Sequence, residues 1–270
     1  MNFIRSLLLA VLFASSAFGA DDLMRQISRK IIEGKREEAM TMLNKAVADE
    51  PKEAKWLLAR GRLHSTMSEN EKAIEDFNRA LNIETNNARI YHERGVAYFK
   101  LADIKKSVAD FDRFVQILPD REPDHWQRGI SLYYAGEYER GRKQFELHQK
   151  VNPNDVENAV WHYLCVARGQ GIEKAKASLI PIEVERDTRV PMKEIFALFA
   201  GKGKPEEVLA AAKKRDEIFY AHQYLGLYYE AQGNRSKAQE HIDKAATEFY
   251  MNHYMGEVAR VHAKLLKKAQ

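Results

Sequence analysis

The sequence predicts an all-α solenoid, a fold in which antiparallel helix hairpins stack in a row. The main observation is one sequence pattern that recurs every 34 residues across 54–153. Three columns follow this step: an Arg-Gly pair (at 60, 94 and 128), a small residue (at 73, 107 and 141) and a phenylalanine (at 77, 111 and 145). A second observation is that prolines at 119 and 153 end two of these units, where helices must stop. A fixed period of this kind is typical of repeats that bury their apolar faces against their neighbours.

The unit from Ala88 to Pro119 shows how one repeat works. Its first helix carries Gly95, and its second helix carries Phe111. A small residue at Gly95 lets the second helix approach closely, and Phe111 is expected to fill the space between neighbouring hairpins. A single hairpin cannot bury this apolar face alone, so stacking stabilises it.

These columns resemble the tetratricopeptide repeat (TPR) family, whose helix–turn–helix unit has the same period. The resemblance implies a superhelix of paired helices with a concave groove. It also implies that the protein binds other proteins or peptides.

Residues 1–20 have the features of a secretory signal peptide. Arg5 supplies a positive charge, an apolar run follows at 7–14, and small residues stand at Ala17 and Gly19. A membrane-spanning helix needs about 20 apolar residues, so this run is too short, and no other stretch approaches that length. We therefore expect an exported protein, periplasmic or secreted after cleavage, with no integral membrane span.

The predicted organisation follows the repeat period. A signal peptide (1–20) precedes an N-terminal array (21–154) with repeats at about 20–53, 54–87, 88–121 and 122–155. Altered helical hairpins (155–218), a further repeat (219–252) and a C-terminal capping helix (253–270) complete the chain. Asp155 is a candidate N-cap for a helix that runs to about Arg168. The step from Gly129 to Gly226 is shorter than three full repeats, so the middle hairpins are irregular.

The second half also resembles the NlpI-type TPR lipoproteins of bacterial envelopes. The resemblance covers roughly 88–268 and rests on the segments 128–136, 152–155, 161–164, 224–229 and 252–253. It implies an envelope adaptor that dimerises, presents substrates to a periplasmic protease and scaffolds peptidoglycan hydrolases. This sequence lacks the lipid-anchor cysteine of those proteins.

Composition and motifs favour binding over catalysis. The net charge of +4 is mild, and no basic run with interleaved aromatic residues indicates a nucleic-acid site. The sequence contains no HExxH, CxxC, GxSxG or glycine-rich phosphate loop. We therefore predict no enzyme, no cofactor, no metal and no catalytic residue. The single cysteine, Cys165, is interpreted as a small buried hydrophobe.

The concave groove is the candidate binding site. Mapped from the TPR resemblance, the groove positions are Arg62, His92, Val96, Phe99, Trp126, Ile130 and Tyr133. Their mix of apolar, aromatic and cationic side chains suits an amphipathic segment of a partner. The alternative is that Trp126 and Tyr133 pack against the next hairpin.

Two functions of different classes remain open from the sequence. The first is a non-catalytic exported adaptor that binds proteins or peptides in its groove, either as a monomer or as a homodimer. The second is a structural subunit of a stable envelope complex, whose groove its own partner fills.

Overall fold

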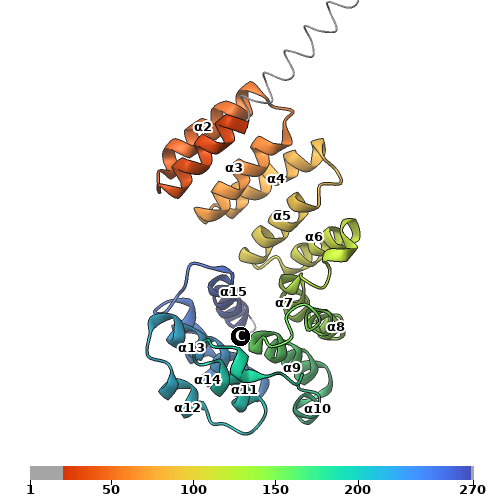
Figure 1. Ribbon diagram of the computed structural model, residues 1–270, viewed down its shortest axis with the longest axis vertical. Coiled ribbons are helices and arrows are strands. Elements are labelled where there is room, and N and C mark those ends of the chain that lie inside the picture. The colour runs from red at the N-terminus through yellow and green to blue at the C-terminus, as the bar shows by residue number, and fades with distance from the viewer. Residues whose placement is uncertain (1–20, 269–270) are drawn as a thin grey trace, which may run out of the picture. The chain divides into compact units, whose positions relative to one another are not determined.

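The computed structural model describes residues 21–268, and within this range every regular element is a helix (Figure 1). The predicted signal peptide, residues 1–20, lies outside the described residues. The chain divides into two compact units, and the boundary in the sequence lies between Thr85 and Asn86. The all-α prediction is therefore confirmed, and each unit is described by itself.

Unit 1, described from residue 21 to 85, consists of packed helix hairpins. Residues 21–32 are helical, and the helices that follow are α2 (Arg36–Asp49), α3 (Ala54–Thr66) and α4 (Asn70–Ile83). The core of unit 1 includes Ile27, Leu43, Trp56 and Phe77, each at most 1% exposed. The Trp56 indole Nε1 also donates a hydrogen bond of 2.5 Å to Glu50.

Unit 2, residues 86–268 as described, is a longer run of hairpins that ends in a single helix (Figure 1). The first hairpins use α5 (Ala88–Lys100), α6 (Ile104–Ile117), α7 (Trp126–Tyr134) and α8 (Tyr138–His148), with the 3-10 turn η1 (Pro119–Arg121) after α6. The middle contains α9 (Val156–Gln170), α10 (Ile172–Ala177), η2 (Val184–Arg186), α11 (Met192–Phe199) and α12 (Pro205–Ala211). The last hairpin is α13 (Arg215–Ala231) and α14 (Arg235–Ala246), followed by α15 (Tyr254–Lys268).

The helix that the sequence predicts after Asp155 is present as α9. The Asp155 carboxylate accepts a hydrogen bond from the backbone N–H of Glu157 at 3.1 Å, as an N-cap does. The middle of unit 2 is irregular, because α10 and α12 are short and 178–191 contains only the 3-10 turn η2.

The repeat columns mark the points where the two helices of a hairpin touch. Phe77, Phe111 and Phe145 are at most 1% exposed. A Cβ atom added at Gly95 would lie 2.7 Å from the ring of Phe111. One added at Gly61 would lie 2.6 Å from the ring of Phe77, and one added at Gly129 would lie 2.7 Å from the ring of Phe145. A methyl group does not fit in such a space, so the glycine column permits the close approach that the sequence predicted.

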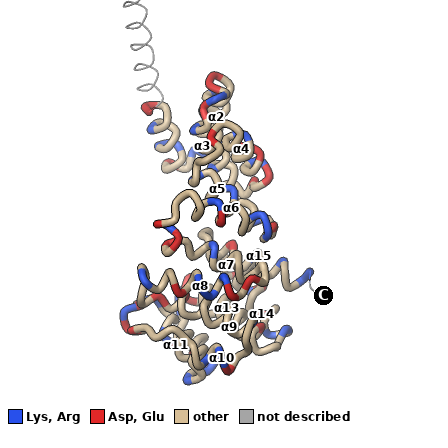
Figure 2. Tube along the Cα trace, turned by 90° about the vertical axis from the view of Figure 1, so that its right-hand side faces the viewer, with Lys and Arg blue, Asp and Glu red and all other residues tan. Residues whose placement is uncertain are grey.

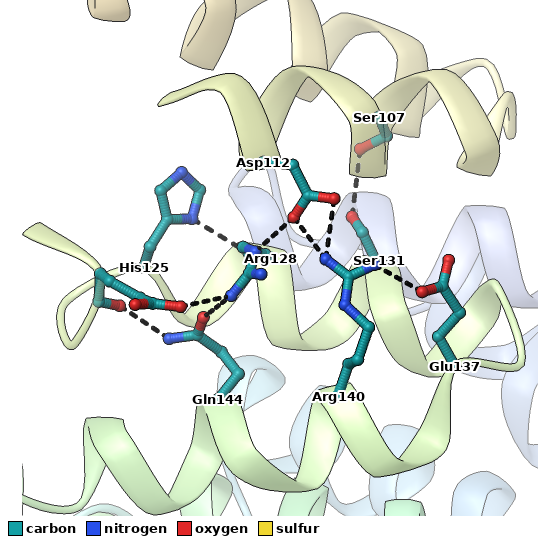
Figure 3. A network of polar contacts seen from close by, with 9 residues as sticks. Ser107, Asp112, His125, Arg128, Ser131, Glu137, Arg140 and Gln144 are labelled. Atoms are coloured by element: carbon teal, nitrogen blue, oxygen red, sulfur yellow. Dashed lines mark hydrogen bonds and ion pairs between the residues drawn. The ribbon is translucent and has the colours of Figure 1, made fainter. Parts of the chain in front are cut away.

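Polar contacts join the consecutive helices α6, α7 and α8 (Figure 3). The Asp112 carboxylate of α6 accepts hydrogen bonds from Arg128 of α7 at 2.8 Å and from Arg140 of α8 at 2.6 Å. Nearby, the buried hydroxyls of Ser107 and Ser131 lie 3.1 Å apart. These charge-assisted bonds fix the spacing of one hairpin on the next. Charged residues of both signs are spread along each unit (Figure 2).

Candidate functional site

The C-terminal helix α15 packs against both the last hairpin and the first hairpins of unit 2. It lies on α14 and also contacts α5, which is among the first helices of this unit (Figure 1). The Tyr254 ring stacks on Phe99 of α5 at 5.4 Å between centroids and meets the edge of Trp126 of α7 at 5.1 Å. Farther along, Lys264 Nζ donates to the carbonyl oxygen of Leu101 at 2.9 Å. The sequence predicted a cap on the open end of the array, whereas α15 also reaches back to α5 and α7.

We call the surface of α5, α7 and α9 that faces α13 and α15 the inner face of unit 2. It is defined by Phe99, Trp126, Ile130, Tyr133, Tyr134 and Trp161. Its aromatic rings pack edge to face, as Tyr133 and Trp161 do at 5.4 Å. The Tyr133 hydroxyl donates to Glu230 of α13 at 3.3 Å, and the Tyr134 hydroxyl lies 3.0 Å from His262 of α15.

The structure brings four of the predicted groove residues together on the inner face. Phe99, Ile130 and Tyr133 are buried by the chain's own helices, and Trp126 is half-buried. Val96 of α5 is also half-buried. The groove is therefore occupied in part by α13 and α15, and binding of a partner to these residues stays a prediction.

Two predicted groove residues lie elsewhere. Arg62 is exposed on α3 in unit 1. His92 of α5 packs between hairpins, where its ring lies 5.8 Å from Phe111, 5.6 Å from Phe114 and 5.1 Å from His125. The His92 ring therefore packs between α5 and α6 and is not part of the aromatic group around Tyr254.

A pocket of about 380 Å³ remains open on the inner face. Its walls come from α7, α8, α9, α13 and the start of α15. The lining residues are Trp126, Ile130, Phe145, His148, Asn152, Asp155, Glu157, Asn158, Trp161, Tyr220, His253, Tyr254 and Met255. Pockets of this size and apolar lining, with a few polar groups, are typical of binding sites.

Two lining carboxylates, those of Asp155 and Glu157, belong to an acidic cluster that is built around one arginine. Arg189 donates to Asp155, Asp187 and Glu157 at 2.6, 2.6 and 2.5 Å, and the Tyr224 hydroxyl donates to Glu157 at 2.5 Å. Burial raises the pKa of Glu157, and the positive charge of Arg189 opposes the rise. The cluster joins α9 to the connection before α11 and to α13, so it stiffens one wall of the pocket.

Sequence reasoning missed this cluster and also missed the ion pairs that the repeated arginines make with the second helix, such as Arg94 with Asp110 at 2.7 Å. Glu157 and Arg189 are far apart in the chain, and no local pattern relates them. The arginine column had a signal, because an aspartate precedes the phenylalanine at both 76 and 110, again one repeat apart.

The single cysteine of the chain is buried, and the described residues show no metal site or membrane span. Cys165 is 1% exposed, and burial raises the pKa of its thiol, so the predicted role of a buried hydrophobe is confirmed. Among residues 21–268, no group of three or more histidine, cysteine or acidic side chains is placed to hold a metal ion. No helix in the same range is long and apolar enough to cross a membrane.

Comparison with known families decides the nature of the repeats. The family described as TPR repeat matches residues 66–101, and the family described as Tetratricopeptide repeat matches residues 88–121. Residues 66–121 of the chain therefore consist of tetratricopeptide repeats. No curated protein gives a significant sequence match.

Solved TPR structures share the fold at low sequence identity. A tetratricopeptide repeat protein from Parabacteroides merdae is 18% identical, with a TM-score of 0.62 over 92% of this chain and 98% of that one. MamA from Desulfovibrio magneticus is 16% identical, with a TM-score of 0.55 over 63% of this chain and 96% of that one. PilW, described as a type IV pilus biogenesis factor, is 15% identical, with a TM-score of 0.54 over 88% of this chain and 97% of that one. At these identities the likeness concerns the fold of the TPR array alone.

Proposed function

We propose that this TPR protein is a non-catalytic scaffold that binds a segment of another protein on the inner face of unit 2. The observation that carries the proposal is the open pocket between Trp126, Tyr254 and α9. A TPR array has no need of an open aromatic pocket for its own packing, because α15 already covers Phe99 and α13 already bonds to Tyr133. Half-buried aromatic side chains such as Trp126 and Tyr254, placed around a concave site, are typical of the anchor pockets of protein-binding surfaces.

The size of the pocket also limits how much of a partner can enter it. The helices α13 and α15 close much of the inner face, so a long helical ligand does not fit along it. A single side chain with its adjoining backbone matches a volume of about 380 Å³. The partner therefore contributes a short anchor segment, and its remaining contacts lie outside the pocket.

The test is the loss of partner capture on removal of one pocket wall. Trp126→Ala removes a half-buried ring that lines the pocket, and we expect binding to weaken about thirtyfold, which corresponds to about 2 kcal/mol. Tyr98→Ala is the matched control, because Tyr98 is also a half-buried aromatic residue of a first helix but packs beside Lys106 outside the pocket. Capture is measured by crosslinked pull-down with mass spectrometry, beside a circular dichroism melt of each variant. Equal capture by wild type and Trp126→Ala, with equal melting, would overturn the proposal.

The pull-down also separates an adaptor from a structural subunit. An adaptor recovers several partners in substoichiometric amounts, whereas a subunit recovers one partner at a fixed ratio. Retention of one stoichiometric partner by both variants would favour the subunit.

We also propose that the protein works in the cell envelope after export, as a monomer or a homodimer. The proposal rests on Arg5, the apolar run 7–14 and the small residues before Asp21. The NlpI-type resemblance adds presentation of envelope proteins to proteases or cell-wall hydrolases. The intact mass of the native protein should show an N-terminus near Ala20 or Asp21, and light scattering gives its oligomeric state. Native protein that retains Met1 in a cytosolic fraction would contradict export.

A further inference from the structure

Two residues that line the inner-face pocket each carry a buried polar atom with no hydrogen-bond partner among the described residues. These atoms are the amide oxygen Oδ1 of Asn158 and the indole nitrogen Nε1 of Trp161, and both residues are only 2% exposed. The amide nitrogen of Asn158 is satisfied, because it donates to Phe145 O at 3.1 Å and to Gln149 Oε1 at 3.0 Å. A buried polar atom without a partner carries an energetic cost, because its hydrogen bond to water is lost on folding. A ligand that offers a donor to Asn158 and an acceptor to Trp161 would recover that cost.

The negative charge around the pocket favours a cationic group as the hydrogen-bond donor of the ligand. Its lining contains two carboxylates, Asp155 and Glu157, and no lysine or arginine. The carboxylates of Asp155, Glu157 and Asp187 share the single guanidinium of Arg189, which leaves a surplus of two negative charges. An acidic group in this pocket would be repelled, whereas a cation would be attracted.

The aromatic walls fit the rest of a basic side chain. Trp126, Trp161, Tyr220 and Tyr254 all line the pocket. The methylene stem of lysine or arginine packs well on such rings, and the cationic head is attracted to their faces. A neutral aliphatic side chain would fill the same volume but would leave Asn158 Oδ1 unpaired.

We propose, building on the scaffold function above, that the pocket receives a lysine or arginine side chain of the partner segment. The cationic head donates to Asn158 Oδ1 beside Asp155 and Glu157. A backbone carbonyl of the segment accepts from Trp161 Nε1.

The tryptophan indole groups report binding directly. The sequence contains three tryptophans, and Trp56 lies in unit 1 with its Nε1–H already bonded to Glu50. In ¹⁵N-resolved NMR spectra of the full chain, N-acetyl-arginine methylamide and N-acetyl-lysine methylamide should shift the Trp161 and Trp126 indole signals saturably and leave Trp56 unchanged. The norleucine analogue should bind at least tenfold more weakly, and the glutamate analogue should cause no shift. Equal binding of norleucine and arginine, or preferred binding of glutamate, would overturn the proposal.

A charge variant tests the same point on the protein side. Asn152 is exposed and lines the pocket near Asp155, so Asn152→Lys places a competing ammonium group beside the carboxylates. We expect this variant to weaken the arginine and lysine probes at least tenfold. Gln170→Lys adds the same charge at an exposed site on α9 outside the pocket, and should leave probe binding unchanged. Equal loss in both variants would show a general charge effect and contradict a specific site.

The outcomes separate this proposal from the scaffold function. Partner capture that depends on Trp126 but not on Asn152→Lys, together with cationic probes that do not bind, overturns the basic anchor and leaves the scaffold in place. Capture that does not depend on Trp126 overturns the scaffold function. Capture that both Trp126→Ala and Asn152→Lys weaken, with cation-selective probe binding, supports both.

Discussion

The guanidinium of Arg94 donates two hydrogen bonds of 2.7 Å to the carboxylate of Asp110 on the second helix of the same hairpin. Arg60 and Asp76 repeat this arrangement in unit 1 at 2.7 and 2.6 Å. In the next repeat of unit 2, Gln144 takes the acid's position and accepts from Arg128 at 2.7 Å. The arginine of each Arg-Gly pair therefore bonds to a polar side chain of the second helix, a contact that we call the clamp. The glycine beside it contacts the phenylalanine ring.

Removal of the acid from one clamp should destabilise unit 2. Asp110 is 5% exposed, and truncation of one partner of a buried ion pair costs about 3–5 kcal/mol, because the remaining charge is left uncompensated. We expect Asp110→Ala to lower the free energy of unfolding in urea by this amount. Asp103→Ala is the control, since its pair with Lys106 is exposed and contributes less than about 1 kcal/mol. Equal losses in the two variants would show that the clamp contributes no more than a surface pair.

Replacement of the ring that fills a hairpin should be costly as well. Phe111 is fully buried, and large-to-small aromatic changes in a core cost about 3–5 kcal/mol. We expect Phe111→Ala to lower the melting temperature of unit 2 strongly. Phe114→Ala lies on the same helix and removes a half-buried ring, so its effect should be smaller. A Phe111→Ala melt that matches wild type would mean that this side chain is not part of the core.

The local features of this fold were predictable from the sequence because they depend on local packing. The repeat columns predicted the burial of Phe111, and the acid at Asp155 predicted the start of α9. The contact between Tyr254 and Phe99 was not predictable, because the two residues lie near opposite ends of unit 2 and meet only through the curvature of the whole unit. The pocket depends on that contact, so the sequence placed Trp126 and Ile130 on a groove but gave no sign that α15 covers part of it.

The buried histidine at the start of α7 should make unit 2 sensitive to acid. His125 is 3% exposed, and its Nδ1 accepts from the backbone N–H of Arg128 at 3.3 Å. Burial, together with the nearby His92, lowers the pKa of His125 to about 3, far below the usual value of about 6.5. Between these two pH values the unfolded chain binds the proton and the folded chain does not, so stability falls as the pH drops from about 6.5 towards about 3.

The variant that tests this linkage is His125→Asn, which keeps a side-chain acceptor at the N-cap but does not titrate. Below about pH 6 the wild type should lose about 1.4 kcal/mol more per pH unit than the variant. Urea unfolding at a series of pH values from neutral to moderately acidic measures the difference. Parallel stability curves for the two proteins would show that His125 is protonated in the folded state as readily as in the unfolded state.

The position of α15 on the inner face depends on Gly256 in its first turn. A Cβ atom at this position would lie 1.8 Å from the backbone oxygen of Met251, so no side chain fits without movement of the backbone. Gly256→Ala should therefore displace the start of α15 and separate Tyr254 from Phe99 and Trp126. Overpacking of this kind costs about 1–3 kcal/mol. Because Trp126 then gains contact with water, its fluorescence should shift to longer wavelength, and amide exchange in α15 should become faster. Gly169→Ala is the matched control: its Cβ would lie 3.4 Å from Tyr138, an ordinary contact, and a helical alanine is about 1 kcal/mol more favourable than glycine. If Gly256→Ala kept the wild-type melt and exchange pattern, the first turn of α15 would have to be free to adjust, and Gly256 would not hold the helix on the inner face.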